Sequence, residues 1–166
     1  MAAAIGNLAA CSPALDWRES LAEGSGLVAS FPCRPDRHGR SVALGGTTVQ
    51  IDMLVCAAAG ATYAVSYFDV IDPAGIGPAL GALGEAMLSN VQGAGPQLTP
   101  LQIPGMTPNA QSLRLAVVGR KPDGSALQAQ AAFFTKGLRV YQAAVIGAAL
   151  TGDAVDPFFA GLKFRQ

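Results

Sequence analysis

The stretch that decides the fold is Thr47–Ile71, TTVQIDMLVCAAAGATYAVSYFDVI, the longest apolar and β-prone run in a chain of 166 residues. Its first half places apolar side chains at every second position, with Gln50 and Asp52 on the opposite face. Its second half repeats the alternation, with Tyr, Val and Tyr on one face. Because successive side chains of a strand point to opposite faces, this period of two predicts two long strands joined at Ala59-Gly60.

Downstream of this stretch, the spacing of the apolar residues changes from two to three and four. The apolar stripe consists of Ile76, Leu80, Leu83, Met87 and Val91. Such spacing is typical of an amphipathic helix, and Asp72 followed by Pro73 suits the start of one. We therefore expect a single helix of about three to four turns that lies across the central hairpin.

The remaining elements extend the same pattern in both directions. Leu27–Phe31 and Ser41–Leu44 have the composition of short strands, and turn signals at 121–124 and 136–137 predict two more hairpins. A short helix near the C-terminus contains Phe158, Phe159 and Leu162, and these side chains are expected to be buried against the sheet.

The order of these elements predicts one domain of the α+β class over residues 26–166, a mainly antiparallel sheet with helices packed on it. A length of 166 residues suits a single hydrophobic core. Residues 12–25 are interpreted as a tether that ends in a short helical turn. This turn would carry Trp17 and Leu21 on one side, with Trp17 packing against the domain.

Composition narrows the choice of partner and cofactor. The chain is 51% hydrophobic and 13% charged, with a formal net charge of zero, whereas nucleic-acid binders need clustered excess Lys and Arg. No nucleic-acid partner is expected. The glycines at positions 75, 77, 81 and 84 depart from the dinucleotide-binding order, and one histidine with scattered cysteines lacks the spacing of metal ligands. We expect neither a cofactor nor a metal.

Residues 1–11, MAAAIGNLAAC, resemble the end of a bacterial lipoprotein signal peptide. Leu8-Ala9-Ala10-Cys11 matches the lipobox, in which small residues precede the cysteine that receives the lipid. The resemblance implies lipidation of Cys11 and attachment to a membrane through this anchor. Because Ser12 rather than Asp follows, it also implies the periplasmic face of the outer membrane. An Ala-rich helical start with an incidental cysteine is the alternative.

Two cysteines remain once Cys11 carries a lipid, and an oxidising compartment favours their pairing. Cys33 follows one strand and Cys56 lies near the end of another, so a disulfide between them would place their Cα atoms within about 7 Å. Cys56 shares a face with Gln50 and Asp52, so the bridge is expected on the less apolar side of the hairpin. Two independent buried thiols are the alternative.

The segment before Ser41 is the most basic part of the chain, and we interpret it as a candidate partner-binding loop. Its candidate residues are Arg34, Arg37, His38 and Arg40. An ordinary solvated loop is the alternative. A Cys33–His38 dyad would require Cys33 to be a thiolate. A small periplasmic hydrolase or redox enzyme that uses this pair or the 104–109 loop is therefore the alternative function.

Five short motifs resemble small bacterial envelope proteins with the PsbP-like α/β/α sandwich. The motifs are Phe31-Pro32-Cys33-Arg34-Pro35, Tyr63 to Pro73, Pro104-Gly105, Arg139-Val140-Tyr141-Gln142 and Phe158-Phe159-Ala160-Gly161-Leu162-Lys163. This resemblance covers residues 26–164 and implies a scaffold, assembly or binding role. We therefore expect a non-catalytic, lipid-anchored module of the bacterial cell envelope that binds a ligand or another envelope protein.

Overall fold

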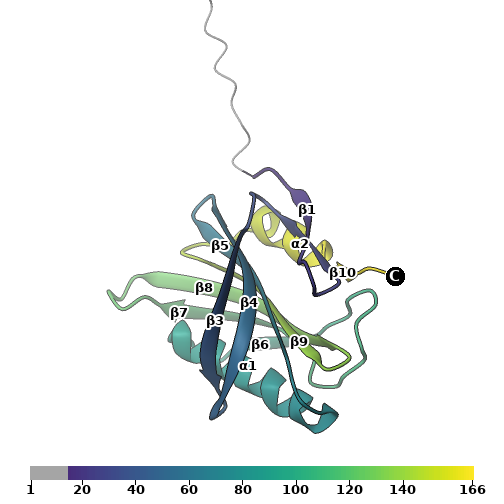
Figure 1. Cartoon of the computed structure of the whole chain (residues 1–166). Coiled ribbons are helices and arrows are strands. Elements are labelled where there is room, and N and C mark those ends of the chain that lie inside the picture. Colours follow the sequence, from purple (N-terminus) through teal and green to yellow (C-terminus); the bar gives the residue numbers. More distant parts are fainter. Residues whose placement is uncertain (1–14) are drawn as a thin grey trace, which may run out of the picture.

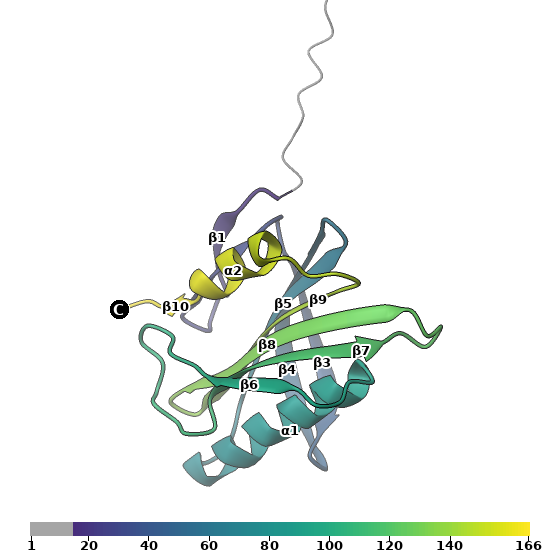
Figure 2. The same cartoon turned by 180° about the vertical axis from the view of Figure 1, so that it is seen from behind.

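The computed structural model describes residues 15–166, which form three layers (Figures 1 and 2). The central layer is a seven-stranded antiparallel sheet with the strand order β3-β4-β5-β9-β8-β7-β6. Helix α1 covers one face of this sheet, and helix α2 covers the other together with a three-stranded sheet of order β1-β2-β10. The predicted α+β class, with a mainly antiparallel sheet and helices packed on it, is confirmed.

The chain passes between these layers several times. The strands of the large sheet are β3 (Asp36–Leu44), β4 (Thr47–Ala58), β5 (Ala61–Asp69), β6 (Gln97–Pro100), β7 (Leu113–Arg120), β8 (Ala126–Lys136) and β9 (Arg139–Gly147). Those of the small sheet are β1 (Arg18–Leu21), β2 (Leu27–Phe31) and β10 (Lys163–Phe164). The helices are the 3-10 helix η1 (Pro73–Gly75), α1 (Ile76–Asn90) and α2 (Gly152–Ala160).

The stretch identified from its period of two forms the hairpin β4–β5, as predicted. Its two strands pair from Asp52–Tyr67 to Ala58–Ala61 and turn through Ala59 and Gly60. Both turn residues have positive φ, +48° at Ala59 and +76° at Gly60. A two-residue turn with this backbone matches the twist of the flanking strands, but it forces an alanine into the left-handed region.

The substitution Ala59→Asn is expected to stabilise the protein by about 0.5–1 kcal/mol, because asparagine tolerates the left-handed conformation better than alanine. The measurement is the free energy of unfolding from urea denaturation. Ala57→Asn, at an exposed strand position two residues earlier, is the control and should bring no gain. Equal effects of the two substitutions would contradict the interpretation of Ala59 as a strained position.

Side chains at alternate positions of the strands point to opposite faces of the large sheet. They fill two separate hydrophobic cores, one on each face. Neighbouring residues of β9 show this directly, since Val140 belongs to the core beneath α1 and Tyr141 to the core beneath α2. The predicted stripe of α1 is buried in the first of these cores, and Phe158, Phe159 and Leu162 are buried in the second.

The face of β4 that carries Gln50 and Asp52 is not the less apolar side throughout, and here the sequence-based prediction is wrong. Leu54 and Cys56 continue the same face and are both buried, with exposed fractions of 9% and 4%. The small sheet and α2 cover this part of the face, so its residues join the second core. This face of the strand therefore changes along its length from exposed or half-exposed at Gln50 and Asp52 to buried at Leu54 and Cys56.

The segment interpreted as a tether with a helical turn also differs from the prediction. Arg18–Leu21 form strand β1, which pairs with β2 in antiparallel register. The fold therefore includes residues before position 26, although they were assigned to a tether over 12–25. Trp17 packs on the domain as predicted, with its ring 5.8 Å from that of Tyr63 in an edge-to-face arrangement.

Candidate functional site

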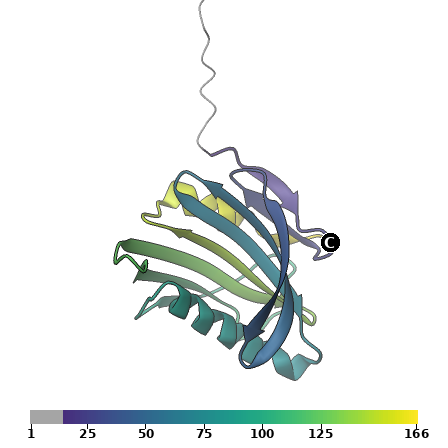
Figure 3. The ribbon, with the colours of Figure 1, turned by 60° about the vertical axis from the view of Figure 1, so that its left-hand side comes forward.

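A groove of about 630 Å³ opens where the β3–β4 hairpin leaves the rest of the sheet. The register of β4 with β5 stops at Asp52–Tyr67, whereas β4 stays paired with β3 down to Thr47. Residues 47–51 of β4 therefore have β3 on one side and the groove on the other. Figure 3 shows this end of the hairpin curving toward α1.

The turn of the hairpin closes one end of the groove by resting on α1. A Cβ atom placed on Gly45 would lie 3.4 Å from the Cβ atom of Ala82, so the turn lies close to the helix. Both turn residues have positive φ, +56° at Gly45 and +81° at Gly46, which glycine adopts without strain. This pair of glycines thus allows the tight turn.

The walls of the groove differ in chemical character. The side toward α1 is apolar and is formed by Leu44, Val49, Phe68, Val70, Ala79 and Ala82. The opposite side contains Gln50, Asp52, Tyr67, Asp69 and Arg139, and Asp72 lies at the mouth. Ile71 also lines the mouth and has 98% of its surface exposed. An amphipathic ligand could therefore be oriented by the two unlike walls.

Arg139 and Asp69 form a two-pronged ion pair at the edge of the groove. The guanidinium Nε donates to Asp69 Oδ1 at 2.6 Å and Nη2 donates to Oδ2 at 2.7 Å. These hydrogen bonds lower the pKa of Asp69 and raise that of Arg139. The pair therefore contributes stability above the ordinary carboxyl pKa of about 4, and this contribution is lost as the pH falls below that value.

Two tyrosines next to this pair fasten the β1–β2 connection to the large sheet. Tyr67 donates to the carbonyl of Glu23 at 2.9 Å, and Tyr141 donates to the carbonyl of Ser25 at 2.7 Å. Burial raises the pKa of Tyr67 and raises the pKa of Tyr141 to about 12. The neutral phenols thus serve as hydrogen-bond donors in the fold rather than as acids in catalysis.

The residues predicted as a partner-binding loop do not form a loop. Arg37, His38 and Arg40 lie on β3, the edge strand of the large sheet, which begins at Asp36 instead of Ser41. Strand alternation places Arg37 on the face opposite to His38 and Arg40, and Arg34 lies before the strand. Arg37 contacts Glu23 at 3.4 Å, so the structure does not gather the four side chains into one basic site.

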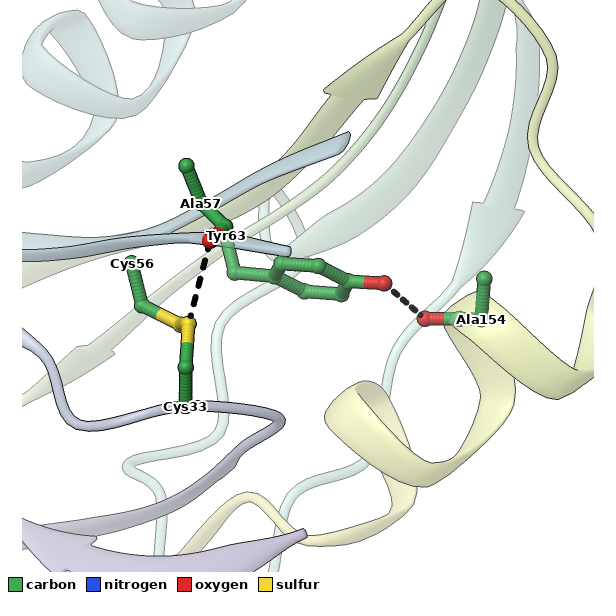
Figure 4. Close-up of a disulfide and its surroundings, with 5 residues drawn as sticks. All are labelled: Cys33, Cys56, Ala57, Tyr63 and Ala154. Atoms are coloured by element: carbon green, nitrogen blue, oxygen red, sulfur yellow. Dashed lines mark hydrogen bonds between the residues drawn. A yellow bond between two sulfur atoms is a disulfide. The ribbon is translucent and has the colours of Figure 1, made fainter. Parts of the chain in front are cut away.

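Cys33 and Cys56 form a disulfide, with Cα atoms 6.0 Å apart, inside the predicted limit (Figure 4). The bridge joins the connection between β2 and β3 to the C-terminal part of β4, next to the β4–β5 turn. Cys33 Sγ also lies 3.4 Å from the carbonyl oxygen of Ala57, and this is a packing contact because a disulfide sulfur carries no hydrogen. Nearby, the Tyr63 hydroxyl donates to the Ala154 carbonyl at 2.9 Å and ties β5 to α2.

The disulfide also bears on the alternative, catalytic use of this region. With its sulfur bonded to Cys56, Cys33 has no thiolate for a Cys33–His38 dyad. The 104–109 loop is held by its own contacts, because Thr107 N–H donates to the Thr135 carbonyl and Pro104 accepts from Phe164 N–H. These contacts give the loop a structural role. Cys11, the predicted lipidation site, lies outside the described residues.

Over residues 15–166, the His, Cys, Asp and Glu side chains do not gather in a group of three or more that could hold a metal ion. In the same part of the chain, each helix is too short or too polar to cross a membrane. No protein-family model matches the sequence, and no curated protein is detectably similar to it.

Sequence reasoning missed the groove, since its residues come from six separate elements, β3, β4, β5, η1, α1 and β9. Arg139 belongs to one of the five motifs, but no local pattern links it to Asp69, which is 70 positions away. The signal in the sequence that points to the groove is the change from polar to apolar residues along β4. Polar residues dominate before position 53 and apolar ones after it, as expected where a strand leaves the covered part of a sheet.

Reduction of the disulfide is expected to lower the free energy of unfolding by about 3 kcal/mol, because the bridge closes a long loop in the unfolded chain. The measurement is urea denaturation with and without reductant. The double variant Cys33→Ala with Cys56→Ala should show the reduced stability under both conditions. A wild-type protein whose stability does not respond to reductant would contradict this expectation.

The substitution Tyr141→Phe should lower the free energy of unfolding by about 1–2 kcal/mol at neutral pH, since the Ser25 carbonyl loses its buried donor. The raised pKa of Tyr141 also stabilises the fold below the ordinary tyrosine pKa of about 10, and this contribution is lost as the pH rises toward about 12. Phenolate absorbance against pH should lack one late-titrating group in the variant. An unchanged titration curve would contradict the assignment.

Proposed function

We propose that the protein is a non-catalytic binding module of the bacterial cell envelope, attached to the outer membrane by a lipid on Cys11. The observation that carries this proposal is the groove, which offers an apolar and a polar wall at the end of the domain away from its first described residues. The lipobox-like Leu8-Ala9-Ala10-Cys11 supports the anchor. Together they suit a domain that holds a partner at a distance from the membrane.

The separation between the start of the described chain and the groove supports this arrangement. Asp16 N–H donates to the Pro32 carbonyl, so the start of the described chain lies beside the β2–β3 connection. That connection is bonded to Cys56 in β4, whereas the groove runs along β4 from Thr47 to Asp52. The bridge is therefore four to nine residues of strand from the groove, which corresponds to about 13–30 Å. An anchor at the N-terminus would leave the mouth of the groove facing away from the lipid surface.

The finer assignment of the fold to the PsbP-like sandwich also belongs to this proposal. A central antiparallel sheet between a helical layer and a mixed layer is compatible with such a sandwich. Two of the motifs that carry the resemblance have structural contacts that explain them. Phe31 is fully buried beneath α2, and the Arg139–Tyr141 pair holds the β1–β2 connection. The resemblance supports a binding or assembly role.

The alternative, a hydrolase or redox enzyme, has less support. The groove contains neither a cysteine nor a histidine, and its tyrosine hydroxyl is already used as a donor to the Glu23 carbonyl. Among the carboxylates of the groove, Asp69 is held by Arg139 and Asp72 accepts from Ala74 N–H. These groups are engaged in maintaining the fold, so a binding function fits the site better than acid–base chemistry.

The anchoring part of the proposal is tested by growing cells that express the full-length gene with radioactive palmitate. Wild-type protein is expected to be labelled and to sediment with outer membranes, because an attachment with two or three acyl chains is stable. Cys11→Ala should lose the label and appear in the soluble fraction.

The matched control is the double variant Cys33→Ala with Cys56→Ala, which removes the other two cysteines and should keep the label. Equal labelling of wild type and Cys11→Ala would show that the anchor is not at Cys11. Labelling of Cys11 with sedimentation in inner membranes would contradict only the proposed outer-membrane location.

A further inference from the structure

We infer that the groove binds an extended peptide segment of a partner protein, which adds to the free edge of β4 as a strand. This inference rests on the proposed binding function and specifies its ligand. The segment is expected to carry apolar side chains on the face toward α1 and at least one basic side chain on the other. Four features of the groove lead to this ligand: its free backbone groups, its size, its charge and the contrast with the other sheet edges.

The hairpin geometry shows which backbone groups of β4 face the groove. Leu44 and Thr47 flank a two-residue turn with positive φ at both positions, so they form a hydrogen-bonded pair. In an antiparallel pair, the residues that exchange hydrogen bonds alternate with residues that do not. Val49 therefore bonds to β3, whereas the N–H and C=O groups of Thr48 and Gln50 point away from β3 into the groove.

The facing wall presents the same kind of group. Lys136 and Arg139 flank the two-residue turn between β8 and β9, so by alternation Val140 directs its backbone toward Phe68 of β5. Asp69, the next residue, then directs its N–H and C=O toward β4. Its partner there would be Gln50, but the described register ends two residue pairs earlier, at Asp52–Tyr67. Free strand groups thus line both sides of the groove.

These free groups favour a peptide over an acyl chain. Burying a backbone N–H or C=O without a partner costs free energy comparable to a lost hydrogen bond. An acyl chain in the groove would cover these groups and satisfy none of them. A peptide strand at the usual spacing of about 4.8 Å brings its own donors and acceptors into register, which is the basis of recognition by strand addition.

The size of the groove fits a short strand. Residues 47–51 of β4 offer an edge of about 16 Å at the rise of an extended chain. The volume of about 630 Å³ lies within the range of ligand sites in proteins. Side chains at alternate positions of the bound segment would enter the apolar side of the groove and pack against Val49, Ala79 and Ala82.

The charge of the groove predicts the other face of the segment. Three carboxylates line it, those of Asp52, Asp69 and Asp72, against one guanidinium, that of Arg139. Arg139 is already paired with Asp69 and also donates to the Gly24 carbonyl. The Arg37 guanidinium lies 3.9 Å from Asp52 and offsets a second carboxylate, so the described lining keeps an excess of one negative charge. This charge favours a Lys or Arg on the polar face of the bound strand.

The other edges of the large sheet are protected against strand addition. On the outer edge, β3 carries Arg37, His38 and Arg40, and charged side chains on an edge strand discourage pairing. At the far edge, β6 has four residues and ends in Pro100, which lacks a backbone donor. The edge of β4 has no such protection from Thr47 to Ile51 and lies recessed in the groove, so it is the edge suited to a specific partner.

The test uses the full chain with Cys11→Ala, in its oxidised form, to select binders from a displayed library of random heptapeptides. The enriched sequences should alternate between apolar and other residues and contain a Lys or Arg. Ala79→Trp, which fills the apolar side of the groove, should abolish their binding. Enrichment of the same sequences by this variant, or no enrichment by either protein, would overturn the inference.

Two proline variants then identify the edge that pairs with a synthetic peptide of an enriched sequence. Thr48 and Ala43 are exposed and lie opposite each other in the register, with free N–H groups that face the groove and the outer edge respectively. Thr48→Pro should weaken binding about tenfold or more, since it removes a donor and obstructs the edge. Ala43→Pro should have little effect; the reverse result would assign the peptide to β3 and overturn the inference.

Hydrogen exchange provides a direct readout of pairing. In the free protein, the amides of Thr48 and Gln50 should exchange faster than those of Val49 and Ile51, which are bonded to β3. Saturation with the peptide should slow the first pair and leave the second unchanged. If instead dodecanoate binds and Ala79→Trp prevents it, while no peptide binds, the binding module is retained and the peptide inference is wrong.

Discussion

The central strands of this protein have to fill two hydrophobic cores at once, and the rest of the structure depends on this constraint. Val140 and Tyr141 are neighbours in the chain, yet they are buried in different cores on opposite faces of the sheet. A strand in this position cannot keep one face polar, so its sequence becomes apolar on both sides. The two covering layers, α1 on one face and α2 with the small sheet on the other, follow from that requirement.

The β3–β4 hairpin lies between the two covering layers over only part of its length. From Asp52 to Ala58, β4 is paired with β5, and its face that carries Leu54 and Cys56 is covered by the second core. Before Asp52, the layer of α2 and the small sheet no longer covers β4. The hairpin bends toward α1 instead, and its turn at Gly45 lies close to Ala82. The groove is thus a consequence of where the double covering ends, and it needs no insertion or special loop to form.

Several cross-links hold the layers of the fold together. The disulfide joins the β2–β3 connection to β4, and Tyr63 ties β5 to α2. Around Arg139, two tyrosine hydroxyls and a guanidinium hold the β1–β2 connection against β5 and β9. The three tyrosine hydrogen bonds satisfy buried or partly buried polar groups that would otherwise destabilise the fold. A body held in this way can support a binding site at the groove.

Local pattern by itself determined the elements: the β4–β5 hairpin from its period of two, the α1 stripe from its spacing of three and four, and the class of the fold from their order. Each of these depends on residues close together in the chain, and the pairing of Cys33 with Cys56 was predicted from the assignment of Cys11 as the lipidation site. Tertiary structure alone decided that residues 36–40 are an edge strand, that Leu54 and Cys56 are buried, and that Arg139 meets Asp69. The physical reason is that burial, edge position and ion pairing depend on which layer covers a strand, and that layer comes from distant parts of the chain.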